Sequence, residues 1–281
     1  MSAYTNNSHS NYNGALFSFK HSGHGFTGQV SYTYSHSLDM ISNGGEGENF
    51  NGASITSQLT PTLGPGNLNY SNSDYDIRNN LVGDLVYEEP LKMSNKILNE
   101  VVGGWVLGAK TYYRGGEPFS IVNGGVLGSF HTLGGSLMPD LASGVTVSQL
   151  VNPTGSNPHS CVDAPCLNGG QFVADGNLAH YANQADFGNL RRNTLYGPHY
   201  VNTDMSVLKK IAQAERFTFQ IGANAYNIFN HVNFAPPTGD ISSEAFGLIT
   251  NAEAPPTSPY GSFQGAAVTQ RLLQVHGKIT F

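Results

Sequence analysis

Apolar and polar residues alternate one by one in several separate stretches of this chain, which is the period of a strand with two unlike faces. The alternation is clearest at the C-terminal end, where the apolar series consists of Leu273, Val275, Gly277, Ile279 and Phe281. Similar stretches predict strands at residues 12–20, 26–36, 75–88, 101–114, 199–209, 216–227 and 272–281. The pattern therefore predicts an all-β chain with seven strands.

The predicted strands are joined by connections of two very different lengths. Short turns follow Lys20, Glu88 and Lys209. Long stretches rich in Gly, Asn, Ser and Pro cover about 38–73, about 116–197 and the region before the last strand. Long segments without pattern count against a compact soluble domain. An outer-membrane β-barrel, by contrast, has short periplasmic turns and long extracellular loops.

These features favour an antiparallel transmembrane β-barrel segment. With the short turns in the periplasm, the last strand runs downward and brings Phe281 to the periplasmic rim. Aromatic residues near the strand ends fit the girdles of such a barrel, namely Tyr32, Tyr34, Tyr75, Tyr112, Tyr113, Phe217 and Phe219. The alternative is a secreted soluble β-sandwich that binds its partner through long recognition loops, because periodicity is the same for a lipid-facing and a core-facing stripe.

Composition supports β structure and excludes one class of function. Charged residues make up 11% of the chain, against roughly a quarter in typical soluble domains. Glycine (34), phenylalanine (15) and tyrosine (14) are abundant, and aromatic residues suit strands. The net charge is −6, without the basic footprint of a nucleic-acid-binding protein. No run approaches the roughly 18 apolar residues that a membrane helix requires.

The N-terminal residues do not resemble an export signal. Met1 is followed by polar residues, without a basic region or an apolar core. An outer-membrane protein needs such a signal, so we expect Met1 not to be the true start of the parent protein.

Two cysteines lie in the longest loop and predict a disulfide. Cys161 and Cys166 are close enough in sequence to close a small ring, which is plausible chemistry on an oxidising cell surface. Free thiols and zinc are the alternatives, and zinc would need further ligands, of which only His159 is near.

Other polar groupings give weaker hypotheses. His21 and His24 form at most an incomplete metal site. A calcium site at a loop base would use side chains from Asn69, Asn72, Asp74 and Asp76, although the order of an EF-hand loop is absent.

Basic pairs occur at both ends of the predicted strands. Arg191-Arg192 lies near an extracellular strand end, where it would meet an anionic lipid or ligand. Lys209-Lys210 lies near a periplasmic end, where a solvated rim is the ordinary explanation.

Nothing in the chain predicts an enzyme. There is no Gly-x-Ser-x-Gly elbow or other nucleophile signature. Gly44-Gly45-Glu46-Gly47 has no preceding strand and no following helix, so it is not a phosphate loop. No cofactor is predicted.

Five segments and the closing strand together resemble a known family. They are GQVSYTYSHSLD (28–39), YDIRNNLVGDLVYEEP (75–90), GGWVLGAKTYYRGGEPFSI (103–121), NLRRNTLYGPHYVNTDMSVLKK (189–210) and ERFTFQIGANAYNIFNHVNF (215–234). In this order they resemble the C-terminal barrel region of TonB-dependent outer-membrane receptors, of the Oar-like group with a carboxypeptidase-regulatory-like domain. The most specific piece is the N-x-F-N-H-x-N-F run from Asn227 to Phe234, whose Phe229 and Phe234 we expect in the outer girdle.

The resemblance implies both a domain organisation and a function. Residues 1–281 would be the C-terminal part of a barrel of about 22 strands, with no second domain; the plug, signal peptide and N-terminal strands would be absent. The parent would transport a bulky ligand with energy from TonB, and this chain would supply lumen wall and ligand-facing loops. Its expected partners are outer-membrane lipid, an unknown ligand, the TonB complex through the missing part, and the barrel-assembly machinery. The machinery would read Val275, Gly277, Ile279 and Phe281 in the last strand.

Overall fold

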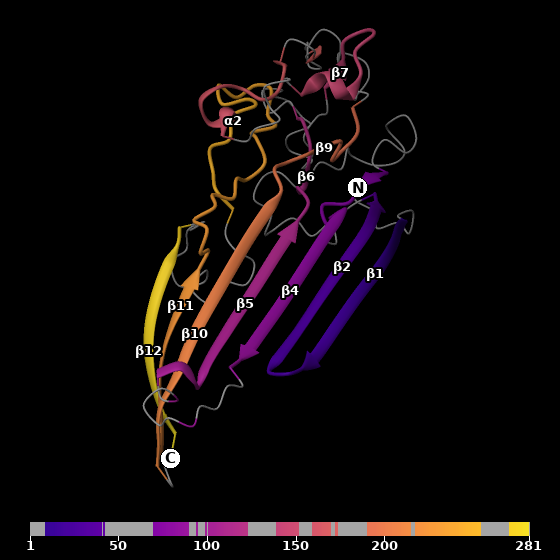
Figure 1. Cartoon of the computed structure of the whole chain (residues 1–281). Helices are drawn as coiled ribbons and strands as arrows, with labels where there is room; N and C mark the ends of the chain where they lie inside the picture. Colours follow the sequence, from indigo (N-terminus) through magenta and orange to yellow (C-terminus); the bar gives the residue numbers. More distant parts are fainter. Residues whose placement is uncertain are drawn as a thin grey trace, which may run out of the picture.

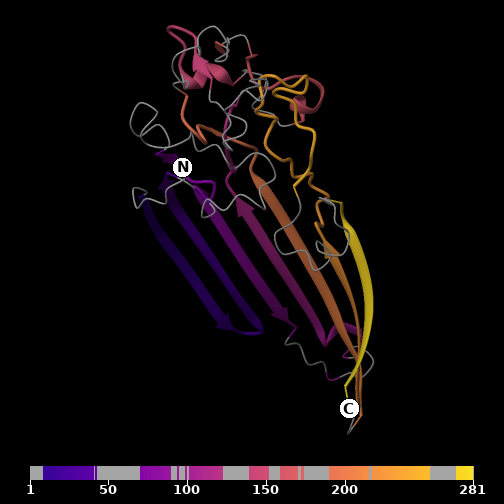
Figure 2. The ribbon, with the colours of Figure 1, turned by 180° about the vertical axis from the view of Figure 1, so that it is seen from behind.

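One single-layer antiparallel sheet forms the body of the molecule (Figure 1, Figure 2). The computed structural model describes residues 9–40, 42, 70–89, 94, 99, 101–122, 139–151, 159–169, 172–173, 190–214, 217–253 and 270–280. The long strands are β1 (Ser10–Gly23), β2 (Phe26–Asp39), β4 (Asn79–Glu88), β5 (Trp105–Arg114), β10 (Tyr200–Ala214), β11 (Phe217–Tyr226) and β12 (Leu272–Thr280). They are hydrogen-bonded in chain order, β1-β2-β4-β5-β10-β11-β12. All seven predicted strands are thus confirmed.

Two predicted strands begin later than their sequence pattern suggested. The strand expected from residue 75 begins at Asn79, because Asp74 and Tyr75 lie in a turn, where the Asp74 side chain pairs with Arg192. The strand expected from residue 101 begins at Trp105, after Gly104 at φ +75°. In the other direction, β10 runs on to Ala214, with a register shift between Lys210 and Ala212.

Strand register places most of the apolar positions that the sequence pattern identified on one face of the sheet. One such row runs across the sheet through His21, Gly28, Leu85, Ala109, Met205, Ala225 and Leu273. The neighbouring row, on the opposite face, runs through Lys20, Gln29, Asp84, Lys110 and Asp204. The period of two therefore holds across the sheet as well as along each strand.

The apolar face is open to its surroundings over most of its described area. Phe19 is 69% exposed, Val275 76% and Ile279 62%. No second sheet covers this face in the part of the chain that the structure describes, so the sandwich alternative gains no support. Several apolar and aromatic side chains lie on the polar face instead, among them Tyr12, Leu16, Val82, Val86, Val106, Tyr112, Tyr200 and Leu208. Tyr112 therefore does not join the predicted girdle.

Short and long connections lie at opposite ends of the sheet, as the sequence predicted (Figure 1). The β1–β2 turn consists of His24 and Gly25, with φ of 51° and 79°. Two residues with positive φ form the turn type that matches the twist of a hairpin. β12 ends at the same end as this turn (Figure 1, Figure 2).

The long connections at the other end form what we call the loop lobe, the described residues 117–122, 139–151, 159–169, 172–173, 190–199 and 233–253. Its elements are β6 (Pro118–Phe119), β7 (Asp140–Leu141), η3 (Val147–Leu150), α2 (Ser160–Asp163), β8 (Phe172–Val173) and β9 (Leu195–Tyr196), while β3 (Ser71–Asn72) pairs with β2. β6 pairs with β9, and β7 with β8. No helix among the described residues is long and apolar enough to cross a membrane.

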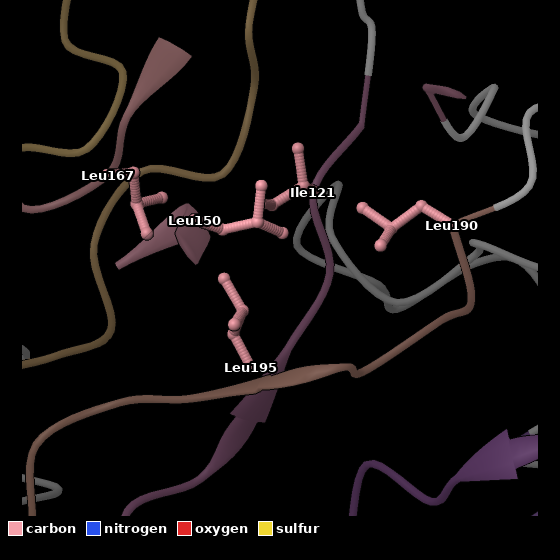
Figure 3. Close-up of a cluster of buried hydrophobic side chains, with 5 residues drawn as sticks. All are labelled: Ile121, Leu150, Leu167, Leu190 and Leu195. Carbon is pink, nitrogen blue, oxygen red and sulfur yellow. The ribbon is translucent and has the colours of Figure 1, made fainter. Parts of the chain in front are cut away.

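The lobe contains the main buried apolar cluster of the described chain. Ile121, Leu150, Leu167, Leu190 and Leu195 pack together there (Figure 3), each at most 6% exposed. The sequence of residues 116–197 shows no regular pattern, yet the described part of this segment supplies all five residues of the cluster. Its apolar residues are too irregularly spaced to show a period, yet they meet in space.

The opposed faces give a direct test in the protein assembled in the outer membrane. Val30→Arg places a charge on the apolar face and should cost about 2–4 kcal/mol near the bilayer midplane. We expect a clear loss of folded protein from the outer membrane, measured by heat-modifiable migration. The matched control is Gln29→Arg, the adjacent residue on the polar face opposite Asp84, which should assemble normally. Equal losses in both variants would contradict the assignment of faces.

Candidate functional site: the polar face and the loop lobe

The polar face of the sheet carries a shallow charged depression. A pocket of about 280 Å³ lies over β4, β5, β10 and β11, and Asp84, Lys110 and Asp204 line it. Lys110 Nζ lies 3.9 Å from Asp84 Oδ1, and both side chains are at least half exposed. An exposed pair at this distance contributes little to stability, so these charges remain accessible from solvent.

Arg192 anchors the loop lobe to the ends of β2 and β3. Its side chain is 1% exposed and its guanidinium pairs with Asp39 and, at 3.4 Å, with Asp74. It also donates to Ser42 Oγ and to the Asp39 carbonyl, each at 3.1 Å. The expectation that this arginine meets an anionic ligand is wrong, because its charge is already used inside the protein. Arg191 remains exposed and lies 3.4 Å from the Tyr70 carbonyl.

In the buried cluster around Arg192, one guanidinium forms ion pairs with two carboxylates, those of Asp39 and Asp74. Burial raises the pKa of Asp74, although hydrogen bonding from Asn193 and the charge of Arg192 oppose this effect. Asn193 Nδ2 donates both to Asp74 and to the Asn72 carbonyl. Asn193 has φ +53°, a conformation that Asn tolerates better than most residues.

Asp76 forms a second anchor, on the apolar side of the sheet. Its fully buried carboxylate accepts from Arg78 Nε at 2.8 Å, from the Ser37 amide at 2.7 Å and from the Tyr196 hydroxyl, and His36 Nδ1 lies 3.1 Å away. Burial alone would raise the pKa of Asp76, but these hydrogen bonds together hold the pKa below its ordinary value. Burial and the bond to Asp76 raise the pKa of Tyr196 to about 12, so this hydroxyl stays protonated.

The two anchors replace the calcium site that the sequence suggested. Asp74 and Asp76 bond to different arginines, and Asn72 Nδ2 donates to the Asn193 carbonyl at 2.7 Å. Asn69 lies outside the described residues. Among the described residues, no three His, Cys, Asp or Glu side chains are grouped to hold a metal ion, and His21 instead lies beside the Phe26 ring.

The Asn227–Phe234 run completes the edge of β10 where β11 ends. β10 pairs with β11 only from Met205 onward. Beyond this point the Ile228 amide donates to the Thr203 carbonyl at 2.9 Å. Asn233 accepts from the Val201 amide at 2.8 Å and donates to its carbonyl at 3.0 Å, so its side-chain amide acts as a neighbouring peptide group.

The asparagines of this run satisfy turn backbone, as expected from turn chemistry. The buried Asn227 donates to the His231 carbonyl and accepts from the His231 amide. Phe229 is 74% exposed at the end of β11, whereas Phe234 packs against the cluster of Cys161, Cys166 and Ile249. The placement of Phe234 in the girdle is thus wrong: it belongs to the interior of the lobe.

Cys161 and Cys166 are joined as a disulfide in the structure, both buried in the lobe. The ring of His159 packs edge-on against Phe234, with centroids 4.9 Å apart. The oxidised state of the two thiols in the cell stays a prediction.

Lys209 differs from its expected place on a solvated rim. It lies on the apolar face opposite Trp105 and is 8% exposed. Its Nζ donates to the carbonyls of Gly103 and Val101 and lies 5.0 Å from the centre of the Trp105 ring. The neighbouring Lys210 is exposed. The buried lysine therefore holds the short connection before β5 to the sheet.

Comparison with known proteins agrees with this geometry. Residues 1–274 match the model of the outer membrane beta barrel domain family. The chain belongs to this family, and its location is the outer membrane. No curated protein and no solved structure matches the chain.

Of the residues expected to form the assembly signal, Val275, Gly277 and Ile279 lie on the apolar face of β12. Phe281 lies outside the described residues. Their role in assembly stays a prediction.

Removing the Arg192 charge should release the lobe while leaving the sheet intact. Arg192→Met leaves Asp39 and Asp74 buried without their cation, which we expect to cost about 3–5 kcal/mol. Limited proteolysis in increasing urea would measure this as earlier cleavage of the lobe. The neighbouring exposed Arg191→Met should stay within about 1 kcal/mol of the wild type; equal sensitivity of the two variants would contradict the anchor.

The second anchor should fail in acid. Because the pKa of Asp76 is lowered from 3.8 in the folded protein, its contribution is complete above the unfolded value and is lost as pH falls through the folded value. Asp74, whose pKa is raised, acts in the opposite direction. Pepsin digestion below pH 3.8 should cleave the wild-type lobe progressively faster. Asp76→Asn should make the lobe weaker at neutral pH and remove most of this acid dependence; an unchanged acid profile would refute the assignment.

Proposed function

We propose that this chain is the C-terminal part of a TonB-dependent outer-membrane receptor barrel of the Oar-like group. The observation that carries the proposal is the two-faced sheet: seven strands in register, apolar on one face and polar and charged on the other, with all described long loops at one end. A channel wall requires this arrangement, because lipid contacts one face and aqueous lumen the other.

The edges of the sheet support a larger barrel. Among the described strands, β1 pairs only with β2 and β12 only with β11. Unpaired backbone groups in lipid cost several kcal/mol each. Further strands of the parent, about 22 in all by the resemblance, would pair with these edges.

The proposed transport uses both surfaces described above. The loop lobe and the charged polar face receive a bulky ligand from outside, and a plug in the missing N-terminal part gates the lumen under the control of TonB. The protein acts as a transporter component and not as an enzyme, and it takes no cofactor and no nucleic acid.

Two measurements test the assignment to TonB-dependent receptors. The DNA upstream of the Met1 codon should continue in frame and encode further strands, a plug and a signal peptide. The purified intact parent should then bind the periplasmic domain of TonB, and residues 1–281 alone should not. A stop codon directly upstream, or an intact parent that does not bind the periplasmic domain of TonB, would contradict the proposal.

The barrel-assembly machinery is the proposed partner of β12. Deleting Phe281 from the parent should lower its outer-membrane level while its periplasmic precursor accumulates, as seen by cell fractionation. The control is Phe281→Tyr, which keeps an aromatic side chain and should assemble. Normal levels of the deletion variant would rule out this reading of the last strand.

A further inference from the structure

A second cavity lies on the apolar side of the sheet, where the strand ends meet the underside of the loop lobe. Its volume is about 430 Å³, within the roughly 300–1,000 Å³ range of small-molecule sites. Asn79 pairs with Tyr34, and Tyr113 pairs with Leu81 and Val201. All are positions of the apolar face, so Asn79 and Tyr113 face away from the polar face. Val151 and Tyr196 also line the cavity and are 42% and 38% exposed, so it can be reached from solvent.

The cavity wall is mostly aromatic and apolar. Tyr113, Phe119 and Tyr196 contribute rings, and Leu167 and Leu195 of the lobe cluster (Figure 3) contribute aliphatic surface. The rings are held in place by their neighbours. The centroids of Tyr113 and His199 are 5.8 Å apart, and the Arg78 guanidinium lies 5.7 Å from the centre of the Tyr196 ring.

The electrostatics of the cavity do not favour an ionic ligand. Arg78 is the one residue with a permanent charge among the described residues that line it. Its Nε is bonded to the buried Asp76 at 2.8 Å, so the pair is neutral overall. A phosphate or carboxylate entering here would have to compete with a carboxylate that four protein groups already hold in place.

Planar polar side chains lie beside the aromatic rings of the cavity and can form hydrogen bonds with a ligand. Asn79 accepts from the Tyr32 hydroxyl through its carbonyl oxygen at 2.7 Å, which leaves its two N–H donors out of that bond. His199 adds an imidazole, and Arg78 adds its Nη1 group, since its Nη2 lies 3.4 Å from His36 Nε2. Ring faces alternating with planar donors match a sugar ring, which has C–H faces and hydroxyl edges.

We propose that this cavity binds a neutral saccharide at the outer surface of the barrel. The site lies on the outer side of the wall, so this inference goes beyond the proposed transport function and does not depend on TonB. The saccharide can be a free glycan or the headgroup of a glycolipid in the outer leaflet, since the cavity adjoins the lipid-facing surface.

The test uses the intact parent protein in nanodiscs. Saturation-transfer NMR and calorimetry would measure binding of free disaccharides of glucose, galactose, mannose and N-acetylglucosamine, with inorganic phosphate and citrate as anionic probes. A second set of nanodiscs would contain a neutral galactolipid, compared with phosphatidylethanolamine alone. Binding of a free sugar identifies a soluble ligand; retention of the galactolipid alone identifies a headgroup. Either result supports the inference, and binding of neither, or preferential binding of the anions, overturns it.

A matched pair of variants locates the binding. Val151→Trp fills the cavity and should weaken saccharide binding at least about tenfold, or about 1.4 kcal/mol. Val162→Trp is its control, because Val162 is similarly exposed at 47% in the same lobe and does not line the cavity. His199→Ala should also weaken binding. Proteolysis of the lobe would verify that each variant is folded, and equal affinities of the two tryptophan variants would refute the site.

The outcome is separable from that of the proposed transport. Saccharide binding that persists in a parent unable to bind TonB would leave this inference standing and remove the transport proposal. A parent that binds TonB, but whose two tryptophan variants bind saccharide equally well, would support the transport proposal and refute this inference.

Discussion

The structure depends on one constraint, that a backbone inside lipid must find all its hydrogen-bond partners within the protein. Seven long strands meet this constraint inside the sheet by pairing with their neighbours in chain order, and of these strands, within the described chain, only β1 and β12 keep an unpaired outer edge. Once the strands are paired, successive side chains point to opposite faces of the sheet, so the period of two decides which residues each face carries. One face must be acceptable to acyl chains, and the other is free to carry Asp84, Lys110 and Asp204.

The same requirement extends above the strands, where pairing ends. β11 stops before β10 does, and the side chain of Asn233 takes the place of the missing peptide at Val201. The asparagine side chains of the Asn227–Phe234 run thus form hydrogen bonds mainly with backbone groups. Its resemblance to a receptor motif has a physical basis in this role, because only an amide side chain can donate and accept like a peptide group.

The loop lobe is held by a different kind of interaction from the sheet. Arg192 on one side and Asp76 on the other place charged groups in buried positions, each with opposite charges and hydrogen bonds around them. Such clusters are costly to break on one side only. They fix the segment from Leu190 to Tyr196 over the strand ends, and this segment in turn carries Leu190 and Leu195 into the apolar cluster. The lobe therefore has a defined shape, which a binding surface needs.

The sequence by itself determined the strands, their facing and the two kinds of connection, since each depends on local periodicity and turn residues. It also indicated the barrel class and the outer-membrane location through the resemblance. Only the tertiary structure decided what the polar residues of the loops do. Arg192, Asp74 and Phe234 looked like a ligand contact, a calcium ligand and a girdle residue, but all three side chains have their partners within the protein. Their partners lie far away along the chain, at separations such as the 153 residues between Arg192 and Asp39, and no periodic pattern records contacts of that kind.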